Sequence, residues 1–333
     1  MPWSEPGLLV ACAAGALAIS AGGTAWAIAY ARRRGMLDQP GERRSHATAT
    51  PRGGGIGIVV AILVALGMLG WSQADPSWWW MAAGLMLVAG VGWWDDHRPL
   101  SIAVRLSAHF VAGAALAWSL SLQGAGLPAV LATLVLVPGL VNAWNFMDGI
   151  DGLAASQALL CAIGWACLLA GPWQLLGVVL ALACLGFLPF NLPPARIFLG
   201  DVGSGALGYA MAAMLAGCVA TLPSAIWPLL LLPPMAMLAD SGLTLGWRMA
   251  TGQAWWQPHV EHLFQRCSRR WGHARVTTAY AVWTCVAIGI MLCAQGIPMP
   301  GTLLVVAVMA LASLVAWTLM HRRGATTTEG FGR

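Results

Sequence analysis

The stretch from Leu127 to Gly152, LPAVLATLVLVPGLVNAWNFMDGIDG, changes character within a few residues. Its first part, residues 127–144, is almost wholly apolar and has about the 20 residues that a helix needs to cross the hydrocarbon core of a bilayer. Polar side chains then recur at every third position, at Asn142, Asn145, Asp148 and Asp151. The stretch therefore predicts a membrane helix whose end carries one polar stripe.

The rest of the chain is similarly apolar. Hydrophobic residues make up 59% of the 333 residues and charged residues 9%, which leaves too little polar surface for a soluble domain. We therefore expect an all-α, polytopic membrane protein with one transmembrane domain, residues 1–320, and a short disordered tail, residues 321–333. About eleven stretches are long enough to span the membrane: 7–31, 53–71, 78–94, 102–121, 127–144, 153–170, 173–190, 203–222, 224–243, 276–294 and 300–320.

The basic residues indicate the orientation of these spans. All 17 are arginines, and they lie in or beside the alternate loops 32–52, 95–105, 191–202, 244–275 and 321–333. The positive-inside rule then places the N-terminus outside, and the C-terminus and the polar stripe on the cytoplasmic face. The net charge of +5 fits this topology and an attraction to anionic membrane lipids. No motif that reads nucleic-acid bases is present, so we expect no nucleic-acid partner.

A pair of carboxylates, Asp95 and Asp96, closes the third predicted span. Neighbouring side chains on a helix point about 100° apart, so we expect the two to have different partners. One can hold a metal or another cation while the other accepts a proton or a hydroxyl, and Arg105 is near enough to share their environment. A solvated helix end is the alternative.

The polar stripe offers oxygen ligands. Asn145 provides a neutral oxygen, and Asp148 and Asp151 provide carboxylates, while Gly149 and Gly152 allow a ligand to approach the backbone. The alternative is a structural turn, which does not require two carboxylates and two amides at this spacing.

The segment Gly200-Asp201-Val-Gly203-Ser204 opens the eighth predicted span, where free N–H groups attract phosphate. A carboxylate is a poor neighbour for phosphate unless a cation lies between them, so we assign Asp201 to Mg²⁺, with a helix-capping aspartate as the alternative. Phe198 can stack on a nucleotide base or lie buried.

The longest cytoplasmic loop contains His259, His262 and Arg266, which would share one face if the loop were helical. That face could clamp a pyrophosphate, and a zinc site or a solvated charged loop are the alternatives. Asp240 and Arg248, just before this loop, are compatible with a structural ion pair.

Arg52 precedes a run of glycines, Gly53 to Gly55. The arginines of this first loop can act as topology determinants alone. The glycines suggest a backbone that comes close to an anionic group.

The motifs together resemble, in order and over nearly the whole chain, those of the polyprenyl-phosphate N-acetylhexosamine-1-phosphate transferases (glycosyltransferase family 4). The glycine-rich first loop and Asn145 to Gly152 are most similar to the bacterial enzymes that start O-antigen or other surface polysaccharides. The superfamily also contains the phospho-MurNAc-pentapeptide translocases of peptidoglycan synthesis, whose triple histidine this chain lacks.

The resemblance implies a role for each motif. It assigns Asn145 and Asp201 to Mg²⁺, for which Mn²⁺ can substitute, and Asp95 and Asp96 to the polyprenyl phosphate. It places Asp148, Asp151 and Phe198 around the nucleotide, and His259, His262 and Arg266 at the diphosphate or sugar. Asn142 is also expected to bind substrate. Relatives often use lysine in this site, so Arg52 or Arg105 must replace it here.

The implied reaction joins undecaprenyl phosphate to a UDP-N-acetylhexosamine at the cytoplasmic face of the bacterial inner membrane and releases UMP. A homodimer and the identity of the sugar stay open. The rival from another class is a transporter or flippase for a lipid or nucleotide sugar, which would place its ionisable groups near the middle of the membrane.

Overall fold

The computed structural model describes residues 6–39, 49–254, 256–257 and 259–328, so part of the first predicted cytoplasmic loop and the last five residues lie outside the described chain. Every long element is an α-helix, as the composition predicts. The helices are α1 (Pro6–Arg34), α2 (Ile56–Gln73), α3 (Ser77–His97), α4 (Ile102–Leu122), α5 (Leu127–Met147), α6 (Leu153–Ala166), α7 (Gly171–Asn191), α8 (Gly200–Thr221), the 3-10 helix η2 (Ser224–Leu231), α9 (Met235–Ala250), α10 (Leu263–Trp271), α11 (His273–Cys293) and α12 (Met299–Thr328).

All eleven predicted spans fall on these helices, and the chain is an integral membrane protein. Eight helices of the described chain are long and apolar enough to cross a membrane, or nine if η2 and α9 count as one broken span. The helices α3 and α6 are not among these candidates: α3 contains five tryptophans, which are only moderately apolar, and α6 has only 14 residues.

The predicted ninth span over 224–243 is bent. The segment forms η2 and then α9, and the two helices meet at an angle of 67°. Pro233 and Pro234 separate them, and a proline removes a backbone donor and clashes with the preceding turn. The predicted tail boundary also shifts, because α12 continues to Thr328 and includes residues that we expected to be disordered.

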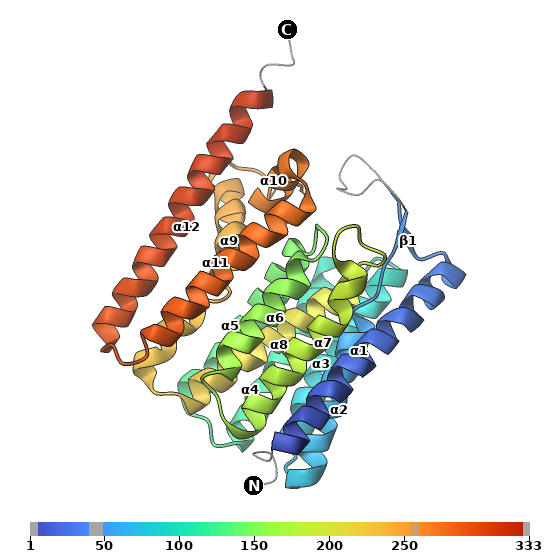
Figure 1. The fold of residues 1–333 in the computed structure, drawn as a ribbon, viewed down its shortest axis with the longest axis vertical. Coiled ribbons are helices and arrows are strands. Elements are labelled where there is room, and N and C mark those ends of the chain that lie inside the picture. Colours follow the sequence, from blue (N-terminus) through green and yellow to red (C-terminus); the bar gives the residue numbers. More distant parts are fainter. Residues whose placement is uncertain (1–5, 40–48, 255, 258, 329–333) are drawn as a thin grey trace.

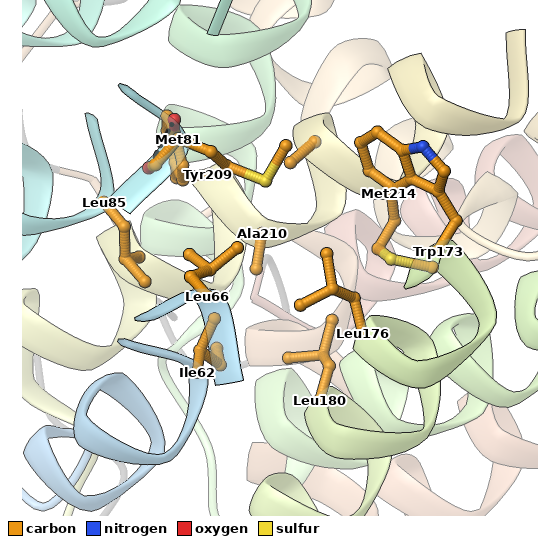
Figure 2. Close-up of a pocket in the computed structure, with 11 residues that line it drawn as sticks. Ile62, Leu66, Met81, Leu85, Trp173, Leu176, Leu180, Tyr209, Ala210 and Met214 are labelled. Atoms are coloured by element: carbon orange, nitrogen blue, oxygen red, sulfur yellow. Dashed lines mark hydrogen bonds between the residues drawn. The ribbon is translucent and has the colours of Figure 1, made fainter. Parts of the chain in front are cut away.

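The helix α8 is the centre of the bundle, and nearly all of its residues are buried. It packs against α3 and α5, which carry the acidic motifs, while α1, α2 and α7 form the neighbouring wall (Figure 1). A small apolar cavity of about 20 Å³ lies between α2, α3, α7 and α8, lined among others by Met81, Trp173 and Tyr209 (Figure 2). Since it has room for about one water molecule, it is a packing defect with no space for a substrate.

A small antiparallel pairing is the exception to the all-helical pattern. The strands β1 (Leu37–Asp38) and β2 (Thr50–Pro51) each contain two residues. The carbonyl of Pro51 accepts a hydrogen bond from the N–H of Phe198 at 2.9 Å. The residues that follow β2 therefore lie beside the start of α8. Figure 1 shows β1 and α10 at the same end of the bundle, opposite the N-terminus.

Candidate active site

The start of α8 is capped by a carboxylate from another helix. The Asp96 carboxylate, on α3, accepts hydrogen bonds from the backbone N–H groups of Asp201 and Val202 at 3.0 and 3.1 Å. Arg52 lies beside it, with Nε 3.8 Å from the Asp96 Oδ1, and also donates to the Asp96 carbonyl. Asp96 is only 2% exposed, so its carboxylate is a buried cap for α8 with an arginine partner.

Glycine is required where these segments meet. Gly200 has a φ of +72°, and a Cβ at this position would lie 2.6 Å from the Asp96 Oδ2 and 2.7 Å from the Gly53 nitrogen. Gly55 and Gly203 approach so closely that a Cβ on Gly203 would lie 2.7 Å from the Cα of Gly55. The run Gly53 to Gly55 therefore packs against the start of α8, and Gly53 lies next to the Asp96 carboxylate that caps this helix.

Asp95 has a different partner from Asp96, as helix geometry predicts. Its Oδ2 pairs with the Nη1 of Arg105 at 3.1 Å, and its Oδ1 accepts the N–H of Leu100. Asp95 also lies within hydrogen-bonding reach of Asp201. Arg105 is 35% exposed and Arg52 is 34% exposed, so each arginine is held by one carboxylate and still reaches solvent.

The two residues assigned to Mg²⁺ are in contact. The Nδ2 of Asn145, at the end of α5, donates hydrogen bonds to the Asp201 Oδ1 at 2.5 Å and to the Ser204 Oγ at 3.1 Å. Sequence reasoning gave no role to Ser204, although it belongs to the same motif as Asp201. The end of α5 and the start of α8 thus bring an amide, a carboxylate and a hydroxyl together.

Asp148 adds a further carboxyl group to this region. It follows the last residue of α5 and donates its N–H to the Asn145 carbonyl at 3.4 Å. Burial raises the pKa of Asp148 well above its usual range, and the nearby negative charges of Asp201, Asp96 and Asp151 raise it further. We call Asp95, Asp96, Asp148 and Asp201 the acidic mouth. A cation bound there would relieve their mutual repulsion.

This donor set fits Mg²⁺. Within the described ranges no three His, Cys, Asp or Glu side chains converge as a closed metal cage would require. Mg²⁺ is usually bound by one or two carboxylates together with substrate phosphates and water, so the Asp201 carboxylate and the oxygen of the Asn145 amide would fit it as protein ligands. The carboxyl group of Asp148 is close enough to Asp201 to interact with it electrostatically.

The other two residues of the polar stripe are engaged elsewhere. The amide of Asn142 donates to the Pro138 carbonyl at 2.7 Å within α5. Asp151 is buried, accepts the N–H of Ala195 at 3.1 Å and lies 3.1 Å from the Nδ1 of His273. Asp151 was expected at the nucleotide and Asn142 at the substrate, and the structure gives each of them a protein partner. Sequence reasoning missed His273 because it lies 122 residues from Asp151.

Phe198 holds the first loop against α8. Its backbone N–H donates to Pro51 and its carbonyl accepts the N–H of Gly54, both at 2.9 Å. The side chain is half-buried. Its predicted place beside a nucleotide base stays a prediction.

The predicted single face of His259, His262 and Arg266 is wrong, because α10 begins only at Leu263. The His262 ring lies 4.7 Å from the His259 ring and stacks on Phe146, next to Asn145, at 5.9 Å. The histidines therefore adjoin the acidic mouth.

Arg266 lies on α10 and turns toward α12. Its Nη1 is 2.9 Å from the Nδ1 of His321 and 3.0 Å from the Nε2. Burial lowers the pKa of His259 to about 4, helped by the charges of His262 and Arg248, so His259 is neutral at pH 7. The three side chains do not form one cationic clamp.

The expected ion pair between Asp240 and Arg248 is also wrong. Arg248 pairs with Glu261, with 2.8 Å between Nη1 and Oε2. The Asp240 carboxylate instead accepts the N–H groups of Leu263 and Phe264, at 2.7 and 2.9 Å. Asp240 thus caps α10, and the sequence indicates this role only in that Asp240 is a single acid within an apolar segment.

Comparison with known proteins gives one family match. A model of glycosyl transferase family 4 matches residues 78–218, a range that contains the four acids of the acidic mouth. The similar proteins include enzymes named as N-acetylglucosamine 1-phosphate transferases and enzymes named as pentapeptide transferases.

Three relatives illustrate the range. The decaprenyl-phosphate N-acetylglucosaminephosphotransferase of Mycobacterium tuberculosis is 35% identical over 216 residues, which cover 55% of this chain and 54% of that protein. The undecaprenyl-phosphate alpha-N-acetylglucosaminyl 1-phosphate transferase of Thermotoga maritima is 32% identical over 183 residues, 54% of this chain and 56% of the relative. The phospho-N-acetylmuramoyl-pentapeptide-transferase of Lactiplantibacillus plantarum is 31% identical over 225 residues, 55% of this chain and 67% of the relative. The match to the mycobacterial protein thus spans about half its length.

Proposed function

Because this chain belongs to glycosyltransferase family 4, the polyprenyl-phosphate N-acetylhexosamine-1-phosphate transferase superfamily, we propose that it transfers a sugar 1-phosphate from a UDP-N-acetylhexosamine to undecaprenyl phosphate. The observation that carries the proposal is the acidic mouth. There Asp201 touches Asn145, and the Asp95–Arg105 pair lies alongside. Acids and arginines at one end of a membrane bundle suit a reaction between two anionic substrates.

In this reaction an oxygen of the acceptor phosphate forms a bond to the β-phosphorus of the UDP-sugar, and the bond from that phosphorus to the oxygen of UMP breaks. The acceptor phosphate is largely ionised at neutral pH, so its attack needs no strong base. Mg²⁺ held by Asp201 and Asn145 would supply positive charge to the diphosphate.

The chain's own residues then bind and orient the substrates. Arg105 and Arg52 are each fixed by one aspartate and each about a third exposed. Their free guanidinium donors can hold the acceptor phosphate beside the donor. Bringing two anions into line in this way is a main contribution to such catalysis. The neutral His259 and the buried His262 would bind the donor through hydrogen bonds.

The finer proposal is a small hexosamine donor and a role in starting O-antigen or another surface polysaccharide at the cytoplasmic face of a bacterial inner membrane. Support comes from the relatives named as N-acetylglucosamine 1-phosphate transferases. The relatives named as pentapeptide transferases make peptidoglycan synthesis the second candidate.

The test is to incubate purified protein with Mg²⁺, undecaprenyl phosphate and a panel of UDP-sugars, and to measure UMP and the lipid product. We expect UMP and a polyprenyl-diphosphate sugar from UDP-N-acetylglucosamine or a 6-deoxy relative. Product from the muramyl-pentapeptide donor alone would make this a peptidoglycan enzyme. Movement of substrate across proteoliposomes without UMP would instead identify a transporter.

A further inference from the structure

A buried carboxylate in α9 joins three helices. Asp240 is 2% exposed. Its Oδ1 accepts the N–H of Leu263 at 2.7 Å and the hydroxyl of Thr244 at 3.2 Å. Its Oδ2 accepts the N–H of Phe264 at 2.9 Å and the hydroxyl of Tyr280 at 2.7 Å. A buried carboxylate persists only when it is hydrogen-bonded in this way, so Asp240 ties α9 to both α10 and α11.

The helix α10 depends on this tie. It has nine residues, and a helix of that length is marginal on its own. Its first two N–H groups point at the Asp240 carboxylate, whose negative charge also suits the positive end of the helix dipole. Removing the carboxylate would leave two buried donors without a partner.

The cap also sets the position of His262, the residue just before α10. Its Nδ1 is buried, makes no hydrogen bond and lies 3.8 Å from the Asp240 Oδ1. A carboxylate at this distance favours the tautomer with the proton on Nδ1. The ring lies 5.9 Å from each of the Phe146 and Phe264 rings.

The same arrangement connects α10 to the acidic mouth. A Cβ on Gly149, the residue after Asp148, would lie 2.9 Å from the Phe264 ring. In the sequence, Phe146 directly follows Asn145 and precedes Asp148 and Gly149. The start of α10 is therefore packed on the segment that carries Asn145 and Asp148.

We propose that Asp240 is a positioning residue for the UDP-sugar. By capping α10 and facing the Nδ1 of His262, it holds the loop that contains His259 and His262, the histidine loop, against the acidic mouth. The assignment rests on the proposed function, because the loop is taken to bind the donor. It concerns the nucleotide-sugar side of the site, since we assign the acceptor phosphate to Arg105 and Arg52, which are paired with Asp95 and Asp96.

The first experiment compares KM values. In Asp240→Asn the NH2 group of the new amide faces the N–H groups or the Tyr280 hydroxyl that donate to Asp240 in the wild type, so at least one donor loses its acceptor. We therefore expect a rise of ~10-fold or more in the KM for UDP-N-acetylglucosamine. The KM for undecaprenyl phosphate should stay within about twofold. Ser241→Ala is the matched control, because Ser241 is a buried neighbour in α9 that bonds only within its own helix. Equal changes in both KM values, or none, would overturn the proposal.

The second experiment is a double-mutant cycle between Asp240→Asn and His262→Ala. If Asp240 acts through His262, the double variant should bind the donor no worse than His262→Ala alone. Additive losses would show that Asp240 does not position His262. Tyr280→Phe removes one hydrogen bond and keeps the ring, so it carries the same KM test if Asp240→Asn does not fold.

A third readout does not depend on turnover. Hydrogen exchange at the amides of Leu263 and Phe264 should be slow in the wild type and faster in Asp240→Asn, but unchanged in Ser241→Ala. If the wild type makes no UMP from any donor, the proposed function fails while this measurement still tests the anchoring. Equal exchange in all three proteins would contradict the role of Asp240 even in an active enzyme.

Discussion

At the level of single residues, the contact between Asp201 and Asn145 is the most direct test of the proposed chemistry. Asp201→Asn and Asn145→Ala should each lower kcat by ~10²-fold or more, as expected when a main electrostatic contact is lost. Asn142→Ala is the matched control, because that amide lies on the same helix and bonds to the Pro138 carbonyl. Near-normal, Mg²⁺-dependent turnover in Asp201→Asn, measured as UMP release, would contradict the assignment.

Asp148 allows a separate prediction about stability and pH. Its raised pKa means that the folded protein holds a proton that the unfolded chain releases, so this carboxylate destabilises the fold as pH rises through the raised pKa. Without Mg²⁺, Asp148→Asn should therefore raise the Tm by about 2–4 °C at pH 8, in line with ~1 kcal/mol, and by less at pH 5.

Two measurements check the origin of this effect. Mg²⁺ should stabilise the wild type more than Asp148→Asn, because the cation relieves the same repulsion. The variant should also lose turnover. A Tm gain that is independent of both pH and Mg²⁺ would mean that charge crowding is not the cause.

At the level of elements, the two aspartates that end α3 should have distinct effects. Asp96 caps α8 and Asp95 holds Arg105. Asp96→Asn should lower both the Tm and kcat, because the start of α8 carries Asp201. Asp95→Asn should mainly raise the KM for undecaprenyl phosphate, ~10-fold, with little change in Tm. Indistinguishable kinetics and thermal melts of the two variants would refute this division.

The helices and their polar ends could be predicted from the sequence, but the partners across helices could not. Apolar length located the helices that are long and apolar enough to cross a membrane, and helix geometry separated Asp95 from Asp96. The contacts of Asp240 with Phe264 and of Arg266 with His321 join residues 24 and 55 positions apart. Such pairs depend on how helices pack, which no local pattern records. Asp151 shows the same limit, since its spacing suggested a ligand and its partner is His273.

At the level of the whole molecule, the arginine distribution predicts which end faces the cytoplasm. In a cysteine-free background, a cysteine at Val260 should react with an impermeant maleimide only after the cells are opened. A cysteine at Gly296, in the exposed loop between α11 and α12, should react in intact cells. Ready labelling of position 260 from outside would reverse the topology and move the acidic mouth to the other face.

The cap of α8 by Asp96 also has a consequence for biogenesis. Asp96 and the N–H of Asp201 are 105 residues apart, so at ~5–20 residues per second the ribosome makes the carboxylate about 5–20 s before its helix. Arg52 is made 44 residues before Asp96 and is therefore available as an early counter-ion. A nascent chain without this arginine would carry an unpaired Asp96 carboxylate at the end of α3 until α8 is made, and should be engaged longer by the membrane insertion and quality-control machinery.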